Sequence, residues 1–472
     1  MVFVKKSINS AFSSLENLLD MTKTNKIFLW SLIGALAGFL FGFDTVVISG
    51  AEKTLQEIWG SSAFFHGVVV MSSALWGTVV GAVFGGAPTD RYGRRLTLIW
   101  IGVFYFVSAV GSALANDPWT FAFFRFLGGL GVGASTVAAP AFISEIAPPK
   151  DRGRLVALYQ FNIVLGILLA FVSNYLLSGI SENAWRWMMG AEAFPAFAYT
   201  VLVFFVPESP RWLLVKKQDK KAAEAVLRSI LPAEEVEKEI AQVVSHEGQA
   251  HTGETIFSKR YRFPLVLAFL IAFFNQFSGI NAFLYYSPRI FELAGLEASA
   301  ALLSSVGIGV TNLVFTLLGL SLIDRFGRRQ LMYIGSFGYI VSLSLVALAF
   351  FLGWKGMAVP VFLFLFIASH AIGQGTVIWV FISEIFPNRI RSWGNSWGSS
   401  THWVFAALIA GNFPWFAQRF GQSSCFSFFA LMMAFQLLFV WKMMPETKGV
   451  PLEEIGGARQ TGDKTSYDSK VD

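Results

Sequence analysis

The chain has 472 residues, of which 54% are hydrophobic and only 14% are charged, and 49 of them are phenylalanine. A water-soluble domain carries about 25% charged residues, so this composition excludes a soluble globular enzyme, and its hydrophobicity excludes a disordered chain. The net charge is +6, and a single cysteine, Cys425, excludes an intramolecular disulfide and a cysteine metal cluster. We therefore expect the outer surface to face lipid.

Apolar stretches of about 20 residues recur along the chain, and each is long enough to cross a bilayer as a helix. The sequence predicts an all-α membrane protein with twelve transmembrane helices. The charged stretch 207–261 is predicted to be a cytoplasmic connector whose segment 219–243 forms short helices over the inner mouth, with a simple tether as the alternative. The predicted spans are 27–51, 63–87, 96–115, 119–142, 155–180, 185–206, 262–286, 300–322, 331–352, 358–382, 394–418 and 422–443.

Lysines and arginines concentrate in the loops that follow the even-numbered spans. Because positive charge marks cytoplasmic loops, we expect these loops and both termini on the cytoplasmic side. Residues 1–26 and the tail 444–472 are accordingly predicted to be cytoplasmic segments. The loops and span ends on the opposite side hold Lys53, Arg186, Arg289, Lys355 and Arg419.

The second half of the chain repeats motifs of the first half in the same order. This repeat predicts two related six-helix bundles, 27–206 and 262–443, and such parallel halves place a substrate site between them at mid-membrane. The matched motifs are GGAPTDRYGRR at 85–95 with GLSLIDRFGRR at 319–329, SEIAPPKDRGR at 144–154 with SEIFPNRIRS at 383–392, and PESPRWL at 207–213 with PETKG at 445–449.

Together with RxxGGxGxG at 125–133, these motifs make the chain resemble the sugar porter family of the major facilitator superfamily over residues 30–454. In pattern it is similar to bacterial proton–sugar symporters. The resemblance implies the major facilitator fold, in which two pseudo-symmetric bundles rock about a central sugar site. It further implies import of a monosaccharide with a proton across the inner cell membrane. A facilitative sugar uniporter, and a symporter of a polyol or another small polyhydroxylated solute, remain open.

Three charged side chains lie inside predicted spans: Asp44 in span 1, Arg125 in span 4 and Glu192 in span 6. Charges are costly within a bilayer, so such residues suggest function. Asp44 and Arg125 are each other's best candidate partner. The resemblance implies that Asp44 is the proton site and that Arg125 pairs with it. A permanent ion pair that locks the N-terminal bundle is the alternative.

Neutral polar and aromatic residues in the spans suit a sugar, because its hydroxyls need amides and its C–H faces need rings. The resemblance implies that Gln276 and Asn281 bind the sugar centrally. It implies the same for Gln160 and Trp379, and it places Phe41 beside the proton site. Hydrogen bonding between helices is the alternative role of the amides. The candidate set is Gln160, Asn275, Gln276, Asn281, Trp379, His402, Trp403, Phe41 and Asn312, with Tyr285 and Tyr286 as candidates for an outer gate.

Some positions depart from the family pattern and leave the sugar unidentified. Asn275 stands where a second glutamine is frequent, Ile167 where some symporters have another glutamine, and His402 where Gln or Asn is usual. Burial beside a neutral sugar favours an uncharged imidazole. We therefore expect His402 to help select the substrate by hydrogen bonding, with a second proton site and simple packing as alternatives.

Acidic and basic residues stand side by side at the cytoplasmic span ends of both repeats. We expect them to pair across the two halves and to close the inner side when the outer side is open. Positive-inside topology is the alternative, and it explains the arginines but not the glutamates. The candidates are Arg91, Arg94, Glu145, Arg152 and Glu208 in the first half and Asp324, Arg325, Arg328, Glu384 and Arg391 in the second.

The sequence offers no nucleophile paired with a base and no histidine or cysteine spacing typical of a metal site. We therefore expect a protein that is not an enzyme and has no cofactor, the proton serving as coupling ion. The expected partners are a small-molecule sugar and the lipid bilayer, with no nucleic acid, and we expect a monomer.

Overall fold

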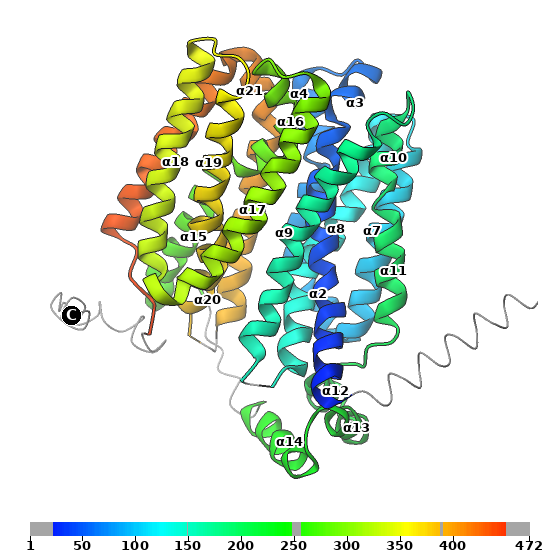
Figure 1. Ribbon diagram of the computed structural model, residues 1–472. Coiled ribbons are helices and arrows are strands. Elements are labelled where there is room, and N and C mark those ends of the chain that lie inside the picture. Colours follow the sequence, from blue (N-terminus) through cyan, green and yellow to red (C-terminus); the bar gives the residue numbers. More distant parts are fainter. Residues whose placement is uncertain (1–21, 149, 248–255, 388–389, 450–472) are drawn as a thin grey trace, which may run out of the picture.

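A computed structural model describes residues 22–148, 150–247, 256–387 and 390–449, and the rest of the predicted terminal segments and connector lies outside the described residues. Figure 1 shows long helices that run side by side, with shorter helices beneath them at one end. The described residues form helices and connecting turns. The predicted all-α membrane fold is therefore confirmed.

The first bundle is built from helices that pack both on sequence neighbours and on helices further along the chain. Two local signals show how such helices begin. The Asp117 carboxylate accepts hydrogen bonds from the backbone N–H groups of Trp119 and Thr120, at 3.0 and 2.9 Å, and Pro118 follows it. The elements are α2 (Lys23–Val47), η1 (Ile48–Gly50), α3 (Glu52–Ile58), α4 (Ala63–Phe65), η2 (His66–Met71, a π-helical turn), α5 (Ser73–Phe84), α6 (Gly86–Tyr92), α7 (Arg94–Leu114), α8 (Pro118–Ile146), α9 (Arg152–Leu177), α10 (Ala184–Gly190) and α11 (Ala193–Val203).

The second bundle contains two broken spans. Predicted span 7 is interrupted at Gly279, whose φ of 82° requires a glycine and whose Cα lies against the ring of Phe429. Span 10 is interrupted at Gly373. The elements are η3 (Lys259–Tyr261), α15 (Arg262–Phe277), α16 (Ile280–Leu293), α17 (Ala298–Phe326), α18 (Arg328–Phe351), α19 (Ala358–Ile372), α20 (Gln374–Glu384) and α21 (Arg391–Lys442).

Ten helical segments in the described part of the chain are long and apolar enough to cross a membrane. The sequence predicts twelve spans, and two local features explain the difference. Predicted spans 11 and 12 both lie within α21, and Gly421, with a φ of 80°, turns the chain between them. The two spans therefore count as one segment. Predicted span 6 is divided between α10 and α11, so neither piece is long enough alone. Predicted spans 6, 11 and 12 therefore all exist as helix.

The charged connector forms α12 (Pro210–Val215), α13 (Lys220–Ile230) and α14 (Ala233–Glu247), which lie beneath the long helices in Figure 1. The indole N–H of Trp212 donates to the carbonyl of Asp90 at 2.8 Å. Apolar side chains of α13 and α14 join the core of the first bundle. The connector helices are thus held against the N-terminal bundle.

Candidate functional site

A cavity of about 120 Å³ lies where the two bundles face each other. All nine residues predicted to bind sugar line it, and they come from α2, α9, α15, α16, α17, α20 and α21. The sequence therefore identified side chains that the fold brings together, although their proposed roles stay predictions. The nine are Phe41, Gln160, Asn275, Gln276, Asn281, Asn312, Trp379, His402 and Trp403.

Amides on the second bundle's side of the cavity form a continuous hydrogen-bonded row. Asn281 donates to the Gln276 carbonyl oxygen at 2.8 Å, and Gln276 donates to the side-chain oxygen of Asn275 at 2.9 Å. The same Gln276 nitrogen lies 3.0 Å from His402 Nε2. The break at Gly279 places Asn281 back beside Gln276. Such a row can exchange its internal bonds for bonds to substrate hydroxyls without leaving a polar group unpaired.

Two buried glutamines continue this row into the second bundle. Asn275 donates to the Gln374 side-chain oxygen at 3.3 Å, and Gln374 donates to that of Gln436 at 2.8 Å. Gln436 in turn donates to Ser336 Oγ at 2.8 Å. Sequence reasoning did not select these residues, although a glutamine within an apolar span is a signal that could have found them.

Aromatic rings complete the cavity wall and connect the two bundles. Phe41 of α2 packs on Trp403 of α21 with ring centroids 5.6 Å apart. His402 lies between Trp403 and Trp379, with centroid distances of 4.7 and 5.0 Å. These rings provide the flat apolar surfaces that the C–H faces of a sugar require.

His370 of α19 also lines the cavity, and sequence reasoning missed it. Its Nδ1 lies 2.5 Å from the hydroxyl of Tyr339 on α18, which fixes the ring orientation. Its Nε2 edge lies over Gly375, where an added Cβ would meet it at 3.3 Å. A histidine in the apolar stretch FIASHAIG is the signal that could have found it.

Three charged groups cluster beside the cavity in the first bundle. The Arg125 guanidinium pairs with one carboxylate oxygen of Asp44 and donates to the Asp44 backbone carbonyl at 2.8 Å. Both side chains are 1% exposed. Glu192 is equally buried, and its carboxyl faces that of Asp44. Thr45, the residue after Asp44, lines the cavity, so the cluster and the cavity share one turn of α2.

Tyr285 and Tyr286, the candidates for an outer gate, are each 1% exposed. Tyr285 lies within electrostatic range of Asp44 and Arg125. Tyr286 donates to the Ala410 carbonyl at 3.1 Å, which joins α16 to α21 inside the second bundle. Tyr285 therefore lies near the charged cluster of the first bundle, whereas Tyr286 is held in the core of the second bundle.

At the helix ends that we predict to face the cytoplasm, called the inner ends below, the candidate charges pair within each bundle. Arg94 reaches Glu145 at 3.0 and 2.9 Å, and Arg328 reaches Glu384 at 2.7 and 3.0 Å. Arg328 also lies 3.3 Å from Asp324. In this structure the pairs lie within each half, because each partner lies on a neighbouring helix of its own bundle. Pairing between the halves when the outer side is open stays a prediction. Of the remaining candidates, Arg91, Arg152 and Arg325 are exposed, and Arg391 donates to the Phe386 carbonyl at 3.4 Å.

A second carboxylate in each repeat, after the last span, holds the start of an earlier helix of the same bundle, α7 or α18. Glu208 accepts from the backbone N–H groups of Arg94 and Arg95 at 2.9 and 3.2 Å, and burial raises the pKa of Glu208 against these lowering bonds. Glu446 accepts from the equivalent N–H groups in the second bundle. The glycine of each DRxGRR motif, at 93 and 327, has φ of 100° and 85° and lies against these carboxylates. The repeated motifs thus have the same structural role in both bundles, because each motif glycine lies against the carboxylate that caps the start of a helix.

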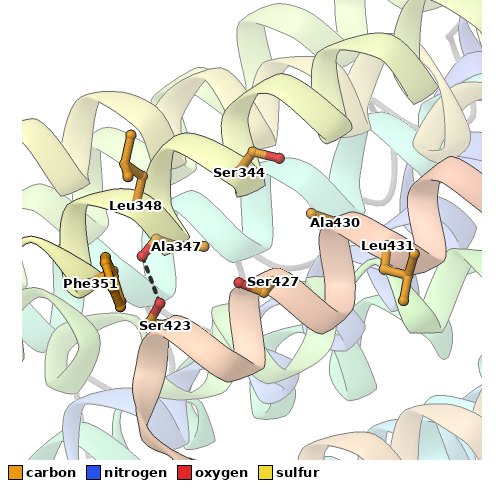
Figure 2. A pocket seen from close by; sticks show the side chains of 8 residues that line it. All are labelled: Ser344, Ala347, Leu348, Phe351, Ser423, Ser427, Ala430 and Leu431. Atoms are coloured by element: carbon orange, nitrogen blue, oxygen red, sulfur yellow. Dashed lines mark hydrogen bonds between the residues drawn. The ribbon is translucent and has the colours of Figure 1, made fainter.

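A larger cavity, about 500 Å³, lies between α18 and α21. Figure 2 shows that serine, alanine and large apolar side chains line it, with Ser423 Oγ donating to the Ala347 carbonyl at 2.9 Å. Its lining offers no amide side chain, unlike the cavity between the bundles. We therefore place the functional site between the bundles.

The family model described as "Sugar (and other) transporter" matches residues 30–458. The D-xylose-proton symporter of Escherichia coli K12 is 33% identical, with 91% of this chain and 95% of that protein covered. A glucose transport protein of Synechocystis is 34% identical, with 91% and 97% covered. A structure of the E. coli xylose transporter XylE in a partially occluded inward open conformation matches with a TM-score of 0.82 at 30% identity, covering 90% of this chain and all of that one. The chain therefore belongs to the sugar porter family of the major facilitator superfamily.

Proposed function

We propose that this protein imports a monosaccharide together with a proton by alternating access, with both termini in the cytoplasm and one chain as the working unit. The observation that carries the proposal is the buried cluster of Asp44, Arg125 and Glu192 beside a cavity lined by neutral amides and rings. Relatives named for D-xylose and proton, and for glucose, support a pentose or hexose as substrate.

The cluster suits a proton because its charges do not balance. One guanidinium faces two carboxyl groups, so the cluster is anionic when both carboxylates are ionised and neutral when they share one proton. Because a buried net charge is costly, the cluster favours the state that holds one proton. The proton is released when a rearrangement separates Asp44 from Glu192 or exposes Asp44 to water. The proton leaves on the side to which the cavity then opens.

The cavity suits a neutral polyhydroxylated ring. We assign Gln160, Asn275, Gln276, Asn281 and His402 to hydrogen bonds with hydroxyl groups, and Asn312 to the far wall. Phe41, Trp379 and Trp403 would cover the C–H faces. Tyr285 and Tyr286 would move with α16 as the outer gate, and the ion pairs at the inner ends would rearrange as the cytoplasmic gate.

The test is uptake by proteoliposomes that contain the purified protein. A panel of hexoses, pentoses and polyols is offered with and without an inward proton gradient. We expect accumulation of at least one monosaccharide above equilibrium only with the gradient, together with inward movement of positive charge. Equal uptake with and without the gradient, or uptake of polyols alone, would contradict the proposal.

A further inference from the structure

The outer end of the interface holds an ion pair between the two bundles that the transport mechanism above does not use. Arg289 of α16 donates to a carboxylate oxygen of Glu52 on α3 at 2.7 Å and to the side-chain oxygen of Gln56 at 2.6 Å. Glu52 is 1% exposed, whereas Arg289 is 35% exposed. A buried carboxylate of the first bundle is thus neutralised by a cation of the second.

His66 is a second basic group beside the same carboxylate. Its Nε2 lies 3.5 Å from Glu52 Oε1, its Nδ1 lies 3.3 Å from Ser61 Oγ, and its side chain is fully buried. The π-helical turn η2 begins at His66. In the described part of the chain, the other oxygen of Glu52 and the Nε2 of His66 have no hydrogen-bond partner. The Nε2 of His66 is therefore available to form a stronger interaction with Glu52.

The charges around His66 are few. Besides Glu52, α3 carries the exposed Glu57 and Lys53, and Lys53 pairs with Glu292 of α16 at 2.5 Å in a solvent-exposed bridge. Tyr286 of α16 lies within electrostatic range of Glu52 and Arg289. The further helices that pack on η2 are α4, α5, α8 and α21, and their charged residues nearest the outer end, Asp117 and Arg419, are exposed. The charged groups nearest His66 are therefore Glu52, which is buried, and its partner Arg289, which is 35% exposed.

We propose that Glu52 and His66 form a second proton-binding site, which takes up one proton from the outer side when the bundles separate there. In the closed arrangement, Arg289 neutralises Glu52. Outward opening moves α16, and with it Arg289, away from α3. Glu52 then remains buried in the first bundle without its cation, and protonation of the neighbouring imidazole restores a counter-ion.

The proposal rests on the alternating access proposed above and concerns a proton separate from the one assigned to Asp44. Because the outward-open state would bind one proton more than the closed state, acidity on the outer side would favour opening. One extra proton changes the ratio of open to closed molecules by up to about tenfold per pH unit. The site would therefore bias the carrier toward the side from which protons enter.

The experiment measures opening directly, without sugar, in purified full-length protein. Spin labels are placed at Ile58→Cys and Ala298→Cys, exposed positions at the outer ends of the two bundles, with Cys425→Ser removing the buried native thiol. The parent also carries Asp44→Asn to remove the central proton site. Distance distributions are recorded from about pH 8 to about pH 5, where histidine titrates. We expect the population with long distances to grow as the pH falls.

His66→Gln in this parent should abolish that growth, and Glu52→Gln should give a large open population at every pH. Glu292→Gln removes only the exposed bridge and serves as the matched control, which keeps the pH dependence. An unchanged pH dependence in His66→Gln would overturn the proposal. If that variant does not fold, a pH dependence retained in Glu52→Gln overturns it instead. Uptake assays judge the proposed function separately, because these distances are measured without substrate.

Discussion

The two bundles share one design at their inner ends and differ at their centres. At the inner ends, Arg94 with Glu145 and Arg328 with Glu384 form the same two-point ion pair. At the centre, the first bundle buries three charged groups, whereas the second presents a row of neutral amides and an imidazole. A shared ancestral unit explains the common ion pair at the inner ends, and different tasks explain the difference between the two centres.

The difference indicates a division of work across the cavity. A neutral sugar does not need a fixed charge, and a buried charge beside it would cost desolvation energy, so amides suit the substrate side. A proton needs a group whose charge can change, and the first bundle supplies it. The predictions below separate these tasks by changing one side at a time.

The largest effect is expected at Asp44. Asp44→Asn removes the charge that a proton can neutralise, so it should abolish uphill accumulation while exchange and downhill flux continue. A proton that enters through 100 mV contributes about 2.3 kcal/mol, which supports about fortyfold accumulation of a neutral solute. Counterflow and gradient-driven uptake in proteoliposomes measure the two activities separately. Continued concentration of sugar by the variant under an imposed gradient would end the assignment of the proton to Asp44.

On the other side of the cavity, Gln276→Ala should weaken substrate binding and leave coupling intact. The loss of one amide leaves hydroxyls unpaired in a desolvated site at about 1–3 kcal/mol, or roughly 5- to 150-fold in affinity. Gln436→Ala is the matched control, because this glutamine belongs to the same row but does not line the cavity. Binding is measured by calorimetry. Equal affinity in Gln276→Ala and wild type, with a lower protein yield, would make the amide a structural link between helices.

The sequence predicted the fold and most of the site because both depend on strong local signals. Twelve apolar runs specify spans, and an intramembrane Asp44 is too costly to be accidental. The ion pairs within each bundle at the inner ends were not predicted, because the sequence shows which charges are present but not which helices are neighbours. His370 and the outer cluster of Glu52 and His66 were missed for the same reason: their significance comes from partners more than 10 residues away in sequence or in the other bundle.

His402 tests where the substrate side ends. His402→Gln keeps a hydrogen-bonding group but alters its reach, so uptake should stay proton-coupled while the ranking among sugars changes by up to about tenfold, the size of one neutral hydrogen bond. The measurement is competition among pentoses and hexoses for uptake. Loss of coupling would make His402 a second proton site and break the division of work. An unaltered ranking would show that the His402 ring only packs between Trp379 and Trp403.

The smallest effect is expected where the bundles are alike, at Glu208 and its counterpart Glu446. Burial raises the pKa of Glu208, so its carboxyl stabilises the fold at low pH and loses this contribution as the pH rises through the raised value.

Glu208→Gln keeps an acceptor for the N–H groups of Arg94 and Arg95 and should lower the melting temperature by no more than about 3 °C near neutral pH. Wild type should gain on this variant as the pH falls toward about 5, since protonation then stabilises Glu208 but not the glutamine. Glu446→Gln, assayed alongside, should show a loss of the same small size, because Glu446 caps the equivalent N–H groups of Arg328 and Arg329. A constant difference between Glu208→Gln and wild type across the pH range would show that burial does not control this carboxyl. A much larger loss in Glu446→Gln would show that the two inner ends, although alike in geometry, are not alike in energy.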